Sequence, residues 1–196
     1  MTRQRQVFAS ALVVGVAALV VGSATFAAFS STTQNSNNDY DAGTVHITDN
    51  DAGGAMLTLT NASGGSTTSG CILVTYSGSL TSVVRMYGAT TGDIAPYLNL
   101  TVTRGTDNSP AFPTCGGSFT PDSTNYIGQG NGVVYSGTLS SFPTNWAGGI
   151  VDAPGAVENW TTSEAHAYKF TVTMSSNTAG QGKAGTATFT WETRNT

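Results

Sequence analysis

The feature that most constrains the fold is an alternation of apolar and polar residues that recurs along the chain. In residues 168–174, YKFTVTM, apolar side chains occupy every second position, with Lys169 and two threonines between them. Successive side chains of a β-strand point to opposite faces, so this period predicts a strand with one buried face. The same pattern predicts strands at residues 43–48, 55–60, 71–76, 82–88, 97–103, 132–137 and 185–192.

Turn-forming residues separate these segments. Clusters of Gly, Asn, Asp and Ser, such as NASGGSTTSG at 61–70, punctuate the chain at short intervals, which is typical of a β-sandwich or barrel. Residues 137–165 lack the alternation and carry two prolines, so they are predicted to form a long irregular connection. The chain has no internal repeat, and residues 41–196 are predicted to form one domain.

The first 27 residues have the pattern of a secretory signal peptide. A basic start with two arginines leads into an apolar stretch at 7–22, and small residues follow. Cleavage is therefore predicted between Ala27 and Ala28. The alternative is an uncleaved membrane anchor, because the apolar stretch and the residues after it approach the roughly 20 residues that span a bilayer. No second hydrophobic span follows, so membrane contact is expected only through the leader.

Charge is scarce, and it is mostly negative. Charged residues make up 9% of the chain, against roughly 25% in ordinary soluble domains. Two of the seven basic residues, Arg3 and Arg5, lie in the leader, so five basic residues remain against eleven acidic ones. This composition excludes the basic footprint of a nucleic-acid-binding protein, and it does not favour an anionic membrane surface.

Cys71 and Cys115 are the only cysteines. Two cysteines in an exported chain predict one disulfide, which fits a secreted protein in an oxidising compartment. The loop that they would close is too long for a redox motif of the CxxC type. In the chain-entropy model its closure contributes roughly 3–4 kcal/mol to stability.

No arrangement of residues predicts catalysis. His46 and His166 are the only histidines, 120 positions apart, so neither an HExxH zinc motif nor a pair of neighbouring histidines is present. The surface or the edge of a sheet is the simpler place for each histidine. A GxSxG nucleophile elbow and a phosphate-binding GxxxxGK[ST] loop are also missing from the sequence. The protein is therefore predicted not to be an enzyme and to need no cofactor.

The weak candidates for a metal site are Asp49 and Asp51. In TDNDAGG, residues 48–54, their spacing and the following glycine resemble the start of a calcium loop, but the third acid and the closing glutamate are missing. A β-turn is the simpler interpretation.

Both ends of the chain carry distinctive segments: GSATFAAFSSTT and, after a short gap, YDAGTVHIT at the N-terminal end, and HAYKFTVTMSSNTAGQGKAGTATFTWET at the C-terminal end. These segments resemble the TasA/camelysin family of secreted biofilm-matrix proteins, and the C-terminal one is similar to the last two strands of that family. The middle segment GCILVTYSGSLTSVVRMYG is similar to its strand pair after a Gly-rich turn, and the cysteines and IAPYLNL look like an actinobacterial branch of secreted relatives.

The resemblance implies a jelly-roll-like antiparallel β-sandwich, processing by a SipW-type signal peptidase, and extracellular fibres in which each freed N-terminus adds a strand to the next subunit. The partner is then a second copy of the chain or a related matrix subunit. Some camelysin-like members are described as surface metalloproteases, but no metal-ligand cluster in this sequence supports that activity. The chain is also shorter than the best-known fibre protein and has a cysteine pair which that protein lacks.

The segment AFSSTTQNSN at 28–37 is too polar to order itself, yet it carries one aromatic side chain. As an added strand it would pair its backbone with an open sheet edge and place Phe29 in a pocket. The residues predicted for the donor strand are Ala28, Phe29, Ser30, Ser31, Thr32 and Thr33. The alternative for the N-terminal segment 28–40 is a flexible spacer between the leader and the first strand. The alternatives for the protein are a non-polymerising cell-surface module that binds carbohydrate or protein through exposed aromatic residues, and a secreted metalloprotease.

Overall fold

The computed structural model describes residues 43–153 and 159–196 of the chain. The predicted leader, the cleavage position between Ala27 and Ala28, and the donor segment 28–37 lie outside the described residues. A signal peptide, its cleavage and a donor strand therefore stay predictions from the sequence.

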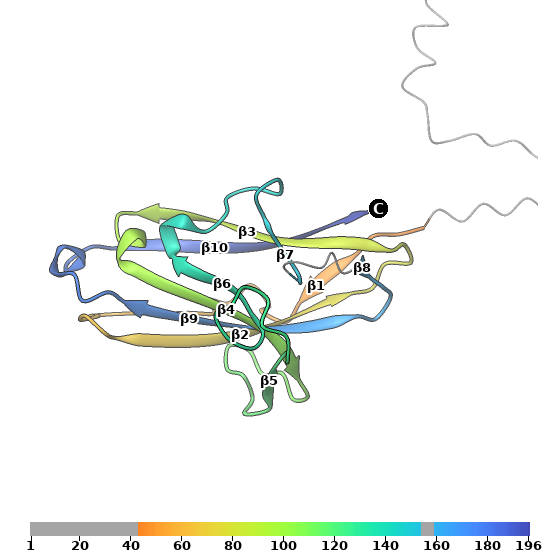
Figure 1. Ribbon diagram of the computed structural model, residues 1–196, viewed down its shortest axis with the longest axis horizontal. Helices are drawn as coiled ribbons and strands as arrows, with labels where there is room; N and C mark the ends of the chain where they lie inside the picture. The colour runs from red at the N-terminus through yellow and green to blue at the C-terminus, as the bar shows by residue number, and fades with distance from the viewer. Residues whose placement is uncertain (1–42, 154–158) are drawn as a thin grey trace, which may run out of the picture. The chain divides into compact units, whose positions relative to one another are not determined.

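The described residues form two antiparallel β-sheets that pack face to face as a sandwich (Figure 1). In the six-stranded sheet the order is β1–β2–β9–β4, and β5 and β6 both pair with β4. Its strands are β1 (Ile47–Asp49), β2 (Thr67–Tyr76), β4 (Leu98–Asp107), β5 (Phe119–Pro121), β6 (Val133–Thr138) and β9 (Ala165–Met174). In the four-stranded sheet β3 pairs with β10 on one side and with β7 and β8 on the other. Its strands are β3 (Ser82–Gly92), β7 (Ile150–Val151), β8 (Asn159–Trp160) and β10 (Gly185–Asn195).

The predicted all-β, antiparallel sandwich is confirmed. The described part of the chain contains no α-helix, only short 3-10 turns at Ala95–Tyr97, Leu139–Ser141 and Thr178–Gly180. The alternation also identified the buried faces of the central strands correctly. The inward side chains of β2, β4 and β9 are almost fully buried: Ile72, Val74, Tyr76, Leu98, Leu100, Val102, Tyr168, Phe170, Val172 and Met174.

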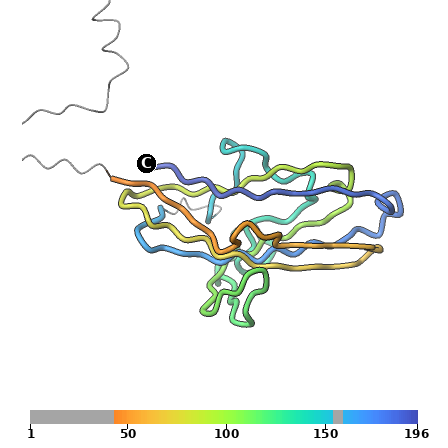
Figure 2. Tube along the Cα trace, turned by 180° about the vertical axis from the view of Figure 1, so that it is seen from behind, coloured from red at the N-terminus to blue at the C-terminus, as the bar shows by residue number. Residues whose placement is uncertain are grey.

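The predicted strand at 55–60 is wrong. These residues run from β1 towards β2 without joining either sheet, and Figure 2 shows this segment beside β2. Other groups already occupy the outer edge of β2. The backbone N–H of Leu73 donates to the side-chain oxygen of Asn50 at 2.9 Å, and that of Cys71 donates to the carbonyl of Pro113 at 2.8 Å. A strand forms only where a partner edge is free, so this segment stays unpaired despite its alternation.

The irregular connection predicted at about 137–165 is largely as expected, apart from residues 154–158, which are not described. It contains the end of β6, the turn at Leu139–Ser141 and the two-residue strands β7 and β8. Both short strands pair with β3, at Arg85–Met86 and Ser82–Val83. The connection therefore extends the smaller sheet on the side opposite β10.

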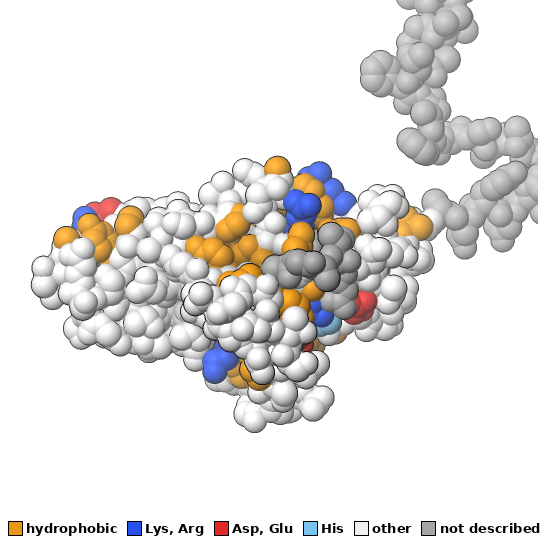
Figure 3. Space-filling view, in the orientation of Figure 1, with side chains coloured by type: hydrophobic (Ala, Val, Ile, Leu, Met, Phe, Trp, Pro, Cys, Tyr) orange, Lys and Arg blue, Asp and Glu red, His pale blue; other side chains and the backbone are white. Residues whose placement is uncertain are grey.

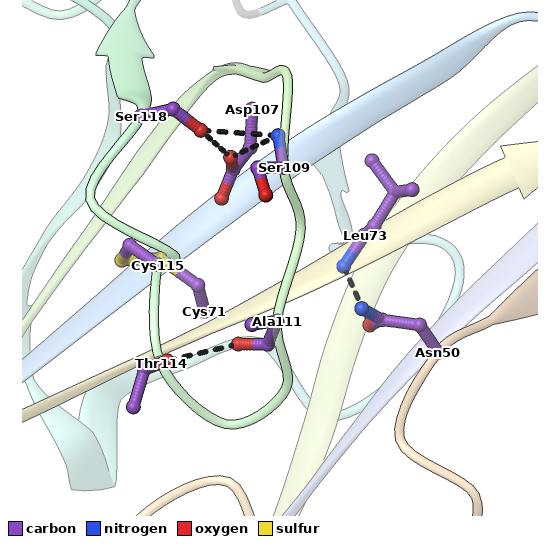
Figure 4. Close-up of a disulfide and its surroundings, with 9 residues drawn as sticks. All are labelled: Asn50, Cys71, Leu73, Asp107, Ser109, Ala111, Thr114, Cys115 and Ser118. Atoms are coloured by element: carbon purple, nitrogen blue, oxygen red, sulfur yellow. Dashed lines mark hydrogen bonds between the residues drawn. A yellow bond between two sulfur atoms is a disulfide. The ribbon is translucent and has the colours of Figure 1, made fainter.

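The predicted disulfide between Cys71 and Cys115 is confirmed (Figure 4), with the two Cα atoms 5.0 Å apart. It ties the outer edge of β2 to the loop that connects β4 to β5. The same loop is braced where Asp107 accepts hydrogen bonds from the Ser109 N–H and the Ser118 hydroxyl. A disulfide of this kind fits an oxidising environment.

Candidate functional site: a groove along strand β10

An apolar groove of about 580 Å³ opens between the two sheets. One wall is the inner face of β10, with Ala187 and Phe189, and the other is the unpaired segment 55–60, with Leu57 and Leu59. The sandwich is therefore not closed along this side. The floor consists of core side chains of the larger sheet and the turn before it: Ile72, Ala95, Leu98 and Val172.

Strand β10 is an edge strand, because β3 is the only strand of the described residues that pairs with it. Phe189 lies opposite Gly88, and the N–H of Gly88 donates away from β10, to the carbonyl of Pro143 at 2.8 Å. Residues 88 and 189 are therefore a non-hydrogen-bonded pair, so the N–H and C=O of Phe189 point to the outer edge of β10. By the same alternation the backbone groups of Ala187 and Trp191 point there too. No described residue hydrogen-bonds to them.

The inner face of β10 is only partly covered. The alternation predicted that Ala187, Phe189 and Trp191 face inward, and they do line the groove, but Ala187 is exposed and the two aromatic side chains are only half-buried. The rings of Phe189 and Trp191 lie 4.5 and 5.9 Å from that of Phe170, which is fully buried. The core thus continues into an incompletely covered aromatic surface.

Segment 55–60 forms the opposite wall and has the side-chain pattern of a strand. Met56, Leu57 and Leu59 pack against the core, while Thr58 and Thr60 are exposed. No backbone hydrogen bond joins this segment to β2 or β10. Two extended stretches with unpaired backbone groups therefore flank an apolar floor, which is the arrangement that binds an added strand.

Asp49 and Asp51, the weak metal candidates, lie at one end of this groove. Asp49 accepts a hydrogen bond from the Asp51 N–H at 3.1 Å, and Asp51 accepts one from the Gly53 N–H at 2.6 Å. Ala52 and Gly53 have φ values of 50° and 78°. This is the geometry of a turn, in which the carboxylates bind local backbone groups. In the described ranges no group of three or more His, Cys, Asp and Glu side chains is placed to hold a metal ion.

Sequence reasoning missed a buried ionic cluster, which does not line the groove. Arg104 follows Leu98, Leu100 and Val102 in the alternation of β4, so it points into the core, and it is 4% exposed. Its guanidinium lies 2.9 Å from a carboxylate oxygen of Asp152. The position of Arg104 in the alternation was the signal available in the sequence.

The cluster continues to both sides of Arg104. Asp122 lies 3.2 Å from its Nε atom, and Nε2 of His166 lies 3.1 Å from one of its terminal nitrogens. His166 is thus a partly buried member of this cluster, and its side chain is 13% exposed. Asp152 also accepts hydrogen bonds from Trp160, at 2.9 Å, and from the hydroxyl of Tyr168. Burial raises the pKa of Asp152, although Arg104 acts in the opposite direction.

Glu164 makes the stability of this cluster dependent on pH. Burial acts to raise its pKa, but hydrogen bonds from Thr161 and His166 outweigh burial, so the pKa lies below the ordinary value of 4.5. A carboxylate with a lowered pKa stabilises the fold fully above its ordinary pKa, and this contribution is lost as the pH falls through the folded-state value.

We therefore expect E164Q to lower the melting temperature at pH 7, and the difference from the unsubstituted protein to shrink between about pH 5 and pH 3. Thermal unfolding across this range measures the effect. Asp152, whose pKa is raised by burial, is present in both proteins. A difference in melting temperature that stays constant down to pH 3 would contradict the lowered pKa of Glu164.

Comparison with known proteins adds no relative: no protein-family model matches the sequence, and no significantly similar curated protein is found. Within residues 43–153 and 159–196, no helix is long and apolar enough to cross a membrane.

Proposed function

We propose that this protein is a secreted structural subunit that polymerises into extracellular fibres, as the resemblance to the TasA/camelysin family implies. In this proposal the groove along β10 receives residues 28–37 of the next subunit as an added strand. The observation that carries the proposal is the unpaired edge of β10 beside an open apolar groove. Among the described residues no strand pairs with this edge, and exposed sheet edges promote association.

The length and chemistry of segment 28–37 suit this groove. Ten residues in an extended conformation span about 33 Å, and β10 has eleven residues. No side chain of the segment carries a charge, so its entry desolvates no ionised side chain. Phe29 supplies the one large apolar side chain, and the aromatic surface at Phe189 and Trp191 offers it a partner.

A fibre would grow because the donor and the acceptor are different parts of each subunit. The donor lies before the described domain, and the acceptor is a surface of that domain, so each subunit uses two different surfaces. Such a heterologous contact propagates into a filament unless its rotation closes a ring. Cleavage after Ala27 would free the donor only after export, and the disulfide supports an oxidising, extracellular setting.

Deletion of residues 28–37 tests the proposal. We expect the chain that begins at Ala28 to form concentration-dependent filaments in negative-stain electron microscopy, and the chain that begins at residue 38 to remain monomeric. The deletion leaves the Ala42–Thr196 unit intact, so its melting temperature should match that of the unassembled protein.

Two controls sharpen this test. A variant in which a Gly/Ser segment of equal length replaces residues 28–37 separates the need for this sequence from the need for a spacer. The uncut chain, with its leader, should also form no filaments. Filaments from the deletion variant would contradict the proposal, and monomers of the Ala28 chain at every concentration would favour a subunit that needs another partner.

A further inference from the structure

A second feature, on the outer face of the smaller sheet, suggests a ligand site that is separate from the groove. The guanidinium carbons of Arg85 and Arg194 lie 5.1 and 4.4 Å from the ring centroid of Trp146. Arg85 belongs to β3 and Arg194 to β10, and the two strands are paired so that Arg194 lies opposite Val83. Two neighbouring strands therefore place one guanidinium each against the same indole.

The loop that carries Trp146 is held in place by its own hydrogen bonds. Arg85 donates from one terminal nitrogen to the carbonyls of Trp146 and Ala147, at 3.0 and 3.1 Å. Within the loop the N–H of Gly148 donates to the side chain of Asn145 at 3.1 Å. The indole is half-buried rather than enclosed in the core. A rigid, partly exposed aromatic ring is suited to binding, because little conformational entropy is lost when a ligand contacts it.

Two positive charges next to each other, as at Trp146, are exceptional for this chain. Only five basic residues follow the leader, and two of them meet at Trp146. Figure 3 shows basic side chains beside hydrophobic ones at the upper part of the view, where Figure 1 shows β3 and β10. The side chain of Arg194 is 55% exposed, and Glu192 contacts its Nε atom at 2.7 Å. The hydrogen bond to Glu192 is donated by Nε and not by a terminal nitrogen of Arg194.

These groups define the chemistry of the ligand. A guanidinium binds carboxylates through paired hydrogen bonds, and a flat indole binds an apolar face. A sugar acid presents both, a carboxylate and a face of C–H groups. Neutral sugars lack the carboxylate, and nucleic acid requires a larger basic surface than two arginines beside a glutamate. We propose that Trp146, Arg85 and Arg194 form a binding site for acidic polysaccharide on the outer face of the smaller sheet.

Isothermal titration calorimetry with polygalacturonate at physiological salt tests the site, with dextran as the neutral polymer and duplex DNA as the other polyanion. The protein is kept below the concentration at which it assembles. We expect binding to polygalacturonate that R194Q and W146A each weaken at least about tenfold, as expected for the loss of a charge-assisted contact or of the aromatic surface. W146F, which keeps an aromatic ring, should retain most of the affinity.

K183Q is the matched control. Lys183 lies 5.8 Å from the ring centroid of Tyr97 and 2.6 Å from Asp93, so K183Q removes the same charge from a similar arrangement elsewhere. The affinity of K183Q for polygalacturonate should stay within about twofold of that of the unsubstituted protein. Melting temperatures will show that all variants fold. Absence of binding to polygalacturonate, equal binding to dextran or DNA, or an equal loss in K183Q would each overturn the proposal. Because no step involves residues 28–37, failure here would leave the assembly proposal untouched.

Discussion

Replacing Arg104 by methionine is expected to lower the free energy of unfolding by about 3–5 kcal/mol. Arg104 lies between two carboxylates, with Asp152 at 2.9 Å and Asp122 at 3.2 Å, and its side chain is 5% exposed. Methionine fills much of the space but leaves Asp152 in the interior without its cation. An uncompensated buried charge costs far more than a lost surface contact. Urea unfolding followed by linear extrapolation measures the loss.

Two comparisons test the physical reason for that loss. Lys169 lies on β9 opposite Thr103, the residue before Arg104, and K169M should change stability by no more than about 0.5 kcal/mol. The double variant R104M/D152N should be more stable than R104M alone, because it removes the carboxylate that R104M leaves unpaired. A loss below about 1 kcal/mol for R104M would show that the cluster is not held together by charge.

Replacing Ala187 by lysine is expected to abolish filament formation while leaving the monomer folded. Ala187 faces the groove from β10, yet it is exposed in the described unit. A lysine there can extend into solvent as long as the groove is open, so the monomer should lose no more than about 0.5 kcal/mol. An inserted strand would cover the ammonium group in an apolar groove and leave it without a partner. Electron microscopy and urea unfolding of the same preparation measure both effects.

T190K is the matched control for this variant. Thr190 lies three residues further along β10 and on the opposite face, outside the groove, where it pairs with Tyr87. It adds the same charge to the same strand, so filaments should still form. If A187K assembles as readily as T190K, the donor does not occupy this groove. If A187K fails to fold, L57K on the opposite wall provides the same test from a half-buried side chain.

The open groove accounts for the difference in burial between strands with the same alternation. Phe170 and Val172 are buried because a strand lies on each side of β9 and the smaller sheet covers its face. Phe189 and Trp191 have the same sequence pattern but lie on an edge strand, and no described strand pairs with its outer edge. Alternation therefore predicts which face of a strand is apolar, but the degree of burial depends on what lies beside and above that strand.

The sequence by itself determined the local properties of this protein. The period of two located most of the strands and their apolar faces, and glycine and asparagine clusters located the turns. The two cysteines predicted the disulfide that forms. The tertiary structure alone decided the rest. Segment 55–60 stays unpaired because Asn50 and Pro113 occupy the edge of β2. Arg104 meets Asp152 and His166 across 48 and 62 residues. Edges, grooves and buried ion pairs depend on contacts between distant segments. A local pattern does not show which distant segment lies beside a given strand edge in the folded protein.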